Sequence, residues 1–214
     1  MSADSVKVRR SYDAARRRHA AAESRRAVLD AARRLLLSTG YAGTTVRSVA
    51  AEAGVSVEFV YKNVGRKAAL LAAVLDVAIA GDDQPVVMAE RASVLALGEL
   101  GTSRDVLAGY VGLLVQVQER VAPLLVLAAQ SSDREATGLL AKADAERLAG
   151  MTGLARHLHR LGGLRPDLDP ERTRDLLWAY TSPHLYDLLV TRRGWPLEDY
   201  EQHVRAALDA ALLS

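Results

Sequence analysis

The chain has no cysteine among its 214 residues. This absence excludes a disulfide framework and any zinc site built on thiolates. Aromatic residues are scarce, with a single phenylalanine, whereas alanine, leucine and arginine are abundant. The abundant residues favour helices, whereas strands are normally rich in aromatic and β-branched side chains. The composition therefore predicts an all-α fold.

Long apolar runs and catalytic motifs are also missing. The N-terminal segment lacks the continuous apolar core of a signal peptide, and no uninterrupted apolar run reaches the roughly 18 residues of a spanning helix. No phosphate-binding glycine loop, nucleophile elbow, dinucleotide fingerprint or zinc-protease motif is present. His157 and His159 are two residues apart and point away from each other on a helix. We therefore expect a soluble, cytoplasmic protein that is not an enzyme and has no metal, cofactor or membrane partner.

The charges are distributed unevenly along the chain. Residues 1–71 contain 14 Lys or Arg and 6 Asp or Glu, a net charge of +8, and the other 143 residues contain 14 and 20, a net charge of −6. A basic first third beside an acidic remainder indicates that one end binds a polyanion. The alternative is a basic tail that is merely solvated.

The first third predicts a basic arm followed by four helices. Residues 1–22 lack the apolar residues of a core, so they predict a mobile arm or a frayed helical extension; their arginines are Arg9, Arg10, Arg16, Arg17 and Arg18. Apolar residues at helical spacing predict a helix over 24–39 that ends at Gly40. Thr44 or Thr45 can cap a helix over 45–53, Gly54 suits a sharp turn, and Ser56 can cap a helix over 57–64. A fourth helix begins near Lys67.

The remaining residues, 76–214, predict a larger helical domain. Its apolar periodic stretches cover residues 87–100, 104–118, 123–131, 133–161 and 197–212. Asp169 before Pro170 predicts a further helix start, and Pro183 predicts a kink or a restart in that helix. No strand pattern or internal repeat competes with this interpretation.

Two short helices joined by a glycine turn inside a basic helical unit have the layout of a helix-turn-helix DNA-binding motif. The segment 44–74, "TTVRSVAAEAGVSVEFVYKNVGRKAALLAAV", also resembles the DNA-binding segment of the TetR family of bacterial transcriptional regulators. The resemblance is specific over residues 25–75. It rests on the threonine-capped helix, the turn at 53–56, Tyr61 and Lys67. It implies an N-terminal helix-turn-helix domain over 23–75 and a ligand-binding and dimerisation domain over 76–214.

The resemblance implies which residues contact DNA, namely Thr44, Thr45, Arg47, Ser56, Val57, Glu58, Phe59, Tyr61, Lys62 and Lys67. The hydroxyls of Thr45 and Tyr61 can donate to phosphate, and the Lys67 amide at a helix N-terminus can bind an anion beside its own ammonium. The exposed face of residues 56–62 would contact bases.

Three of these residues have alternative interpretations. Glu58 either accepts from a cytosine amino group or only stabilises the first helical turn. Phe59 either packs inward or contacts a thymine methyl, and Tyr61 is either half core or fully at the surface. Four residues depart from the usual family pattern and leave the base contacts open: Phe59, Asn63, Val64 and Arg66.

The basic arm and the acidic domain have separate expected roles. The arm arginines can enter a minor groove beside the major-groove site. The resemblance implies a homodimer whose four-helix bundle uses residues 170–190 and 197–212. Each of six leucines would contribute to this interface or pack in its own domain: Leu176, Leu177, Leu188, Leu189, Leu208 and Leu212.

The resemblance also implies a pocket for a small-molecule effector. Candidate orienting groups are polar or aromatic residues inside apolar helices, which alternatively are ordinary core or interface side chains: Tyr110, Gln116, Trp178, Tyr180 and His184. The sequence thus predicts a repressor that an effector releases from a palindromic double-stranded DNA operator. The alternative is a nonspecific, nucleoid-type nucleic-acid-binding protein.

A subgroup is also indicated. The segment "LLWAYTSPHLYDLLVTRRGWPLEDYEQHV" resembles the C-terminal part of a TetR subgroup frequent in high-GC actinobacteria. The 24 arginines against 4 lysines agree with a GC-rich genome.

Overall fold

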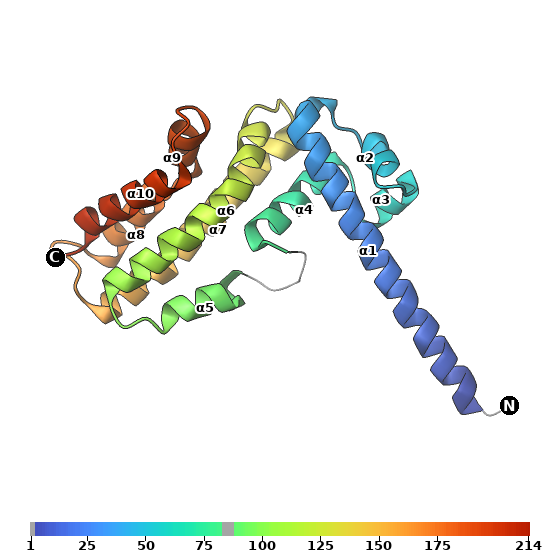
Figure 1. Ribbon diagram of the computed structural model, residues 1–214, viewed down its shortest axis with the longest axis horizontal. Helices are drawn as coiled ribbons and strands as arrows, with labels where there is room; N and C mark the ends of the chain where they lie inside the picture. The colour runs from blue at the N-terminus through green and yellow to red at the C-terminus, as the bar shows by residue number, and fades with distance from the viewer. Residues whose placement is uncertain (1–2, 83–87) are drawn as a thin grey trace. The chain divides into compact units, whose positions relative to one another are not determined.

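The computed structural model describes the backbone of residues 3–82 and 88–214, and the side chains from residue 16 onward apart from 17, 18, 83–87 and 89. The chain divides into two compact units, an N-terminal unit of residues 1–74 and a C-terminal unit of residues 75–214. Helices are the only regular elements in the described parts (Figure 1). The all-α prediction is therefore confirmed.

The N-terminal unit contains α1 (Ala3–Gly43), α2 (Val46–Glu52), α3 (Val57–Asn63) and the first half of α4 (Lys67–Ala80). The helix α1 already begins at Ala3. Of the two forms that the sequence allowed for the basic arm, a mobile segment or a helical extension, its described backbone has the helical one. Its regular geometry is interrupted at Gly40, where φ is 75° and ψ is 172°. The predicted end at Gly40 is thus a break, after which one more turn carries Tyr41 into the interior.

The predicted apolar faces of the N-terminal unit are buried. α2 and α3 lie beside the C-terminal part of α1 (Figure 1). The fully buried side chains include Val28, Ala31 and Ala32 from α1, Val49 from α2 and Val60 from α3. Helices as short as α2 and α3 are marginal alone, so this shared burial stabilises the pair.

The C-terminal unit begins with the end of α4 and continues through η1 (Met88–Glu90), α5 (Ala92–Gly98), α6 (Ser103–Ala129) and α7 (Arg134–Leu161). The prediction of two helices over 104–118 and 123–131 is wrong, because α6 is one helix with Pro123 inside it. A proline costs one backbone hydrogen bond. Its exposed ring is accommodated while the neighbouring Ala122 and Leu124 remain buried in the interior.

The last third contains α8 (Pro170–Tyr180), α9 (Pro183–Tyr186), a π-helical turn η2 (Asp187–Thr191) and α10 (Leu197–Leu212). The predicted restart at Pro183 is confirmed. The Ser182 side chain caps α9 by accepting from the His184 amide at 3.2 Å. Among the described residues the only extended pairing is an isolated antiparallel bridge between Leu164 and Leu213.

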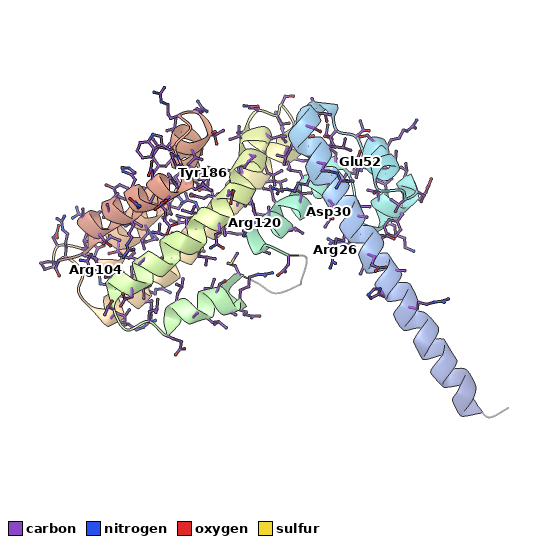
Figure 2. All side chains as sticks on the ribbon, in the orientation of Figure 1. Arg26, Asp30, Glu52, Arg104, Arg120 and Tyr186 are labelled. Atoms are coloured by element: carbon purple, nitrogen blue, oxygen red, sulfur yellow. The ribbon has the colours of Figure 1, made fainter. Side chains whose placement is uncertain are left out.

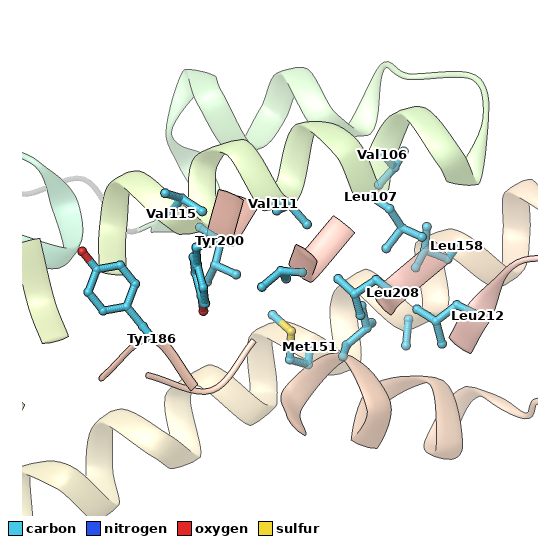
Figure 3. Packing of buried hydrophobic residues seen from close by; sticks show 14 of the residues in the cluster. Val106, Leu107, Val111, Val115, Met151, Leu158, Tyr186, Tyr200, Leu208 and Leu212 are labelled. Atoms are coloured by element: carbon cyan, nitrogen blue, oxygen red, sulfur yellow. The ribbon is translucent and has the colours of Figure 1, made fainter. Parts of the chain in front are cut away.

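The core of the C-terminal unit lies among α6, α7, α8 and α10. Figure 3 shows Val111 of α6, Met151 of α7 and Tyr200 of α10 in this cluster. The rings of Tyr186 and Tyr200 meet edge to face, with centroids 5.3 Å apart. Leu177, Leu208 and Leu212 are fully buried here, so these three serve the core of their own unit. Leu176 and Leu189 are partly buried, and Leu188 is 50% exposed.

The helix α6 is long and apolar enough, by length and composition alone, to span a membrane. Its apolar side chains have another explanation, because Val106, Leu107 and Val111 are fully buried against the other helices of the unit. A central helix of a helical core has this composition without any membrane.

A chain of hydrogen-bonded polar groups joins α6, α7, α8 and α10 of the C-terminal unit. Gln118 of α6 accepts from the Tyr200 hydroxyl at 3.0 Å and donates to the Thr181 carbonyl at 3.0 Å. Arg147 of α7 donates to the Trp178 carbonyl at 2.5 Å. Because α8 stops before Pro183, the carbonyls of its last turn lack regular helical partners. Side chains from α6 and α7 supply them, and this fixes the break between α8 and α9.

We expect the C-terminal unit to lose stability in alkali. Burial raises the pKa of Tyr110 to about 12 and also raises that of Tyr200. A tyrosine whose folded pKa lies above its ordinary value of about 10 stabilises the fold below pH 10, and this contribution disappears as the pH rises through the folded pKa. Urea unfolding followed from pH 9 to pH 12 should show the decline, with a shallower slope in Tyr110→Phe. Equal slopes in both proteins would contradict it.

Candidate nucleic-acid interface

The N-terminal unit holds a pair of short capped helices. The Thr45 hydroxyl accepts from the Ser48 amide at 3.0 Å, and the Ser48 hydroxyl accepts from the Thr45 amide at 3.0 Å. This reciprocal capping box starts α2. The Ser56 hydroxyl accepts from the Phe59 amide at 3.1 Å and starts α3. Between the helices, Gly54 takes a φ of 66°, which favours glycine, so the turn geometry of a helix-turn-helix is present.

One face of α3 is exposed and chemically varied. Glu58, Tyr61 and Lys62 are exposed, and the Tyr61 side chain is 53% accessible. At about 100° per residue these three lie within one arc of the helix, on the side away from the fully buried Val60. Val57 is partly buried. This face offers a carboxylate, a phenol and an ammonium, the groups that contact base edges and phosphates.

The two residues with open interpretations at the start of α3 behave differently. The Glu58 carboxylate accepts from its own backbone amide and from the Ser56 hydroxyl, which holds its pKa below the usual range. Glu58 thus stabilises the first turn and still presents a charged acceptor to solvent. Phe59 is only partly buried, so part of its side chain packs inside the unit and part is accessible at the surface.

Two of the predicted DNA-binding residues use their side chains within the protein. Thr44 is 1% exposed, and its hydroxyl donates to the Gly40 carbonyl at 2.9 Å in the break of α1. The Lys67 ammonium donates to the Ala42 carbonyl at 3.3 Å and lies 4.3 Å from the centre of the Tyr41 ring. The hydroxyl of Thr44 therefore leaves the candidate interface, and Lys67 contributes the N-terminus of α4 instead of a free ammonium.

The remaining predicted contacts lie at the surface. Arg47 on α2, Thr45 and Ser56 are exposed, and so is Arg16 of the arm. The side chains of Arg9, Arg10, Arg17 and Arg18 lie outside the described residues. Arginines with this exposure suit contacts to phosphate.

Contacts that the sequence did not reveal support this face. The Arg34 guanidinium of α1 pairs with Glu52 at the end of α2 at 3.1 Å; Figure 2 labels Glu52 there. Asn63, which departs from the family pattern, donates to the Phe59 carbonyl at 2.8 Å within α3. Gly65 has a φ of 121°, and a Cβ there would lie 2.9 Å from the Ala69 Cβ. The turn before α4 therefore requires glycine.

The predicted effector residues are dispersed over the C-terminal unit. The Tyr110 hydroxyl donates to the Met151 sulfur at 3.5 Å. The Arg147 guanidinium carbon lies over the Trp178 ring, 4.9 Å from its centre. Tyr180 is partly buried, whereas Gln116 and His184 are exposed. Tyr110 and Trp178 thus lie near one polar cluster around Thr181, and Gln116 and His184 have surface positions. Among the described residues, no group of three or more potential metal ligands occurs.

Residues 28–74 match the family model described as "Bacterial regulatory proteins, tetR family". The N-terminal unit therefore contains the domain that this family model describes. The matched span contains α2 and α3, the C-terminal part of α1 and the N-terminal part of α4. Residues beyond 74 lie outside the match, so the rest of the chain is compared through its fold.

The fold of nearly the whole chain is that of TetR-family regulators. A TetR-family regulator of Rhodococcus sp. has a TM-score of 0.69 at 22% identity, covering 89% of this chain and 99% of that chain. FadR of Bacillus subtilis, solved with stearoyl-CoA, has a TM-score of 0.67 at 18% identity, covering 86% and 97%.

NalD of Pseudomonas aeruginosa, the secondary repressor of the MexAB-OprM multidrug efflux pump, has a TM-score of 0.65 at 20% identity, covering 91% and 98%. These similar structures come from several bacterial genera and do not single out one subgroup. No curated protein matches the sequence. The domain match and the fold together support the TetR family and confirm the predicted helix-turn-helix architecture.

Proposed function

We propose that the protein is a transcriptional repressor that binds a palindromic operator as a homodimer and leaves it when a small molecule binds. One observation carries the proposal: in a domain that matches the TetR-family model, α3 follows the Gly54 turn and exposes Glu58, Tyr61 and Lys62 on one face. A single α3 presents too few groups for tight specific binding. Two copies should contact half-sites about 34–36 Å apart, or a multiple of this distance.

A second copy of the chain has a surface to bind beside α10. The exposed large apolar side chains in this part are Leu188 and Trp195, and Trp195 packs edge to face on His203 with centroids 5.5 Å apart. Ala206 and Ala210 are exposed on α10. Small residues allow close approach of helices, and exposed aromatics commonly stabilise interfaces. We assign these residues, rather than the buried leucines, to the dimer interface.

The effector part of the proposal rests on Tyr110, Trp178 and their neighbours. The Trp178 indole nitrogen is buried without a hydrogen-bond acceptor among the described residues. Buried donors normally have partners, so an acceptor from a ligand would satisfy this group. FadR bound to stearoyl-CoA is a similar fold that holds a small molecule.

The arginine-rich composition favours the actinobacterial subgroup, and a cytoplasmic location follows from binding to DNA.

A competition assay separates this function from nonspecific nucleic-acid binding. Light scattering at micromolar concentration should give a dimer, and a duplex selected by the protein should bind about a thousandfold more tightly than random duplex at the same salt concentration. A nucleoid-type protein would bind both duplexes equally, with an affinity set by salt alone. A monomer would contradict the two-half-site mechanism.

The arginines of the arm should add phosphate contacts. We expect deletion of residues 1–20 to weaken operator binding and to reduce the slope of log affinity against log salt by about 0.9 for each lost contact. A matched variant with glutamine at positions 9, 10, 16, 17 and 18 keeps the helical propensity and removes the charges. It should reproduce the deletion. An unchanged affinity and slope in both proteins would show that the arm does not contact DNA.

A further inference from the structure

The exposed face of α3 carries a single negative charge in a basic part of the chain. Glu58 is the only acidic residue between Glu52 and Asp76, a segment that contains three Lys or Arg. Its side chain is exposed. A carboxylate on a surface that meets DNA is repelled by the phosphates, so Glu58 lowers the affinity of this face for DNA in general.

We propose that Glu58 is a specificity-determining residue, which selects a cytosine in each operator half-site and weakens binding to sequences that lack it. The inference rests on the proposed function, because it requires α3 to lie in a major groove. The base is selected by attraction to the cytosine amino group and by repulsion from the acceptors of the other bases.

The Glu58 carboxylate is available to a donor from outside the protein. It accepts from its own backbone amide and from the Ser56 hydroxyl, and these hydrogen bonds hold its pKa below the usual range. The carboxylate is therefore ionised at neutral pH. Its two oxygens offer about four acceptor positions, so the internal hydrogen bonds leave positions open.

No cation neutralises this charge within the protein. Lys62 lies one helical turn further along α3, yet neither it nor another cation among the described residues pairs with Glu58. Glu52 at the end of α2 is different, because the Arg34 guanidinium pairs with it at 3.1 Å. The charge of Glu58 therefore acts on whatever binds the exposed face of α3.

An ionised carboxylate can distinguish cytosine from the other three bases. In the major groove cytosine presents an amino donor alone, whereas adenine presents an acceptor beside its amino group, guanine two acceptors, and thymine an acceptor and a methyl group. A carboxylate only accepts, so any acceptor that faces it is unfavourable. An unpaired charge can thus supply specificity by opposing the wrong partner.

The test combines base substitutions with substitutions of Glu58. In duplexes selected by the wild type, each half-site should contain a cytosine. Replacing it by thymine in both half-sites should lower affinity about 25-fold, or about fivefold for each contact. Glu58→Ala should lose less than about threefold on the same replacement. It should also bind a random duplex about twofold more tightly than the wild type, because the repulsion is removed.

Glu58→Gln gives a change of preference instead of a loss. A glutamine amide both donates and accepts, and it pairs with the amino group and N7 of adenine. This variant should therefore prefer adenine where the wild type prefers cytosine.

Glu23→Gln is the matched control, since it removes a 67% exposed carboxylate from α1 of the same unit. It should keep the wild-type base preference. Thermal unfolding of all variants shows whether they are folded. If Glu58 only stabilised the first turn of α3, its substitution would lower the melting temperature without changing the preferred base.

A cytosine preference that persists in Glu58→Ala and Glu58→Gln would overturn the inference and leave the proposed function standing. A base other than cytosine at the position that depends on Glu58, or weaker binding of Glu58→Ala to random duplex, would also overturn it. If the wild type selected no symmetric motif, the proposed function would fail first, and the inference with it.

Discussion

Replacing Tyr61 by alanine should lower operator affinity by about a hundredfold. Its side chain is 53% exposed on the same arc of α3 as Glu58 and Lys62, so the hydroxyl is available to a phosphate oxygen. A hydrogen bond to a charged group contributes about 1.5–3 kcal/mol. Two copies in a dimer therefore contribute about 3 kcal/mol or more, and each 1.4 kcal/mol is a factor of ten. Fluorescence anisotropy with a labelled operator duplex measures the change.

Two controls separate the hydroxyl from the ring. Tyr61→Phe keeps the ring, so it should show most of the loss if the phosphate contact dominates. Neither change should alter the preferred base sequence, because phosphate contacts position the protein and carry no sequence information directly. Leu95→Ala, a truncation of a 57% exposed side chain on α5, should leave binding unchanged. Full affinity in Tyr61→Ala would remove this residue from the interface.

Replacing Gln118 by methionine should destabilise the C-terminal unit by about 4 kcal/mol. Gln118 is 3% exposed, and its amide joins the Tyr200 hydroxyl to the Thr181 carbonyl. Methionine fills a similar volume and can make neither bond. Two buried polar groups then lose their partners, at about 1–3 kcal/mol each. The free energy of unfolding from urea titration measures the loss.

A double-mutant cycle tests the origin of this effect. Tyr200→Phe removes the hydroxyl that Gln118 accepts from, so in that background Gln118→Met leaves only the Thr181 carbonyl unpaired. The two changes together should cost at least about 1 kcal/mol less than their sum. Gln202→Met, at an exposed position of α10, should change the free energy of unfolding by less than about 0.5 kcal/mol. Strict additivity would show that the buried chain is not energetically coupled.

Local signals in the sequence were enough for several helix starts and turns in both units. The caps at Ser56 and Asp169, the turn at Gly54 and the restart at Pro183 all depend on residues within a few positions of each other. Such signals have a direct physical cause, because a missing amide or a positive φ restricts the backbone wherever it occurs. The structure therefore confirms these predictions.

Predictions that depended on tertiary packing were less successful. Pro123 predicts a break by local rules, yet packing of Ala122 and Leu124 keeps α6 continuous. The sequence also allowed either Thr44 or Thr45 as the cap of α2. Only the break at Gly40 decides that Thr44 points inward and Thr45 caps.

The leucines of α8 and α10 illustrate a further limit. Apolar residues at helical spacing are required both by a core and by a dimer interface, so periodicity cannot distinguish the two. In the structure Leu177 and Leu208 belong to the core, while Trp195 and Ala206 remain at the surface. The hydrogen bond from the Arg120 Nε of α6 to the Ala78 carbonyl of α4 was not apparent in the sequence, because arginines are abundant in this chain and a backbone carbonyl carries no sequence signal.

The most direct test of the central claim is selection of bound duplexes from a random pool by the wild-type protein, with Tyr61→Ala as the matched control. If α3 binds a major groove in each half of a dimer, the selected sequences should share a two-fold symmetric motif. At the same protein concentration Tyr61→Ala should enrich this motif much less, because its affinity is expected to be about a hundredfold lower. Enrichment without symmetry, or equal enrichment by Tyr61→Ala, would contradict the claim that this face of α3 recognises the operator.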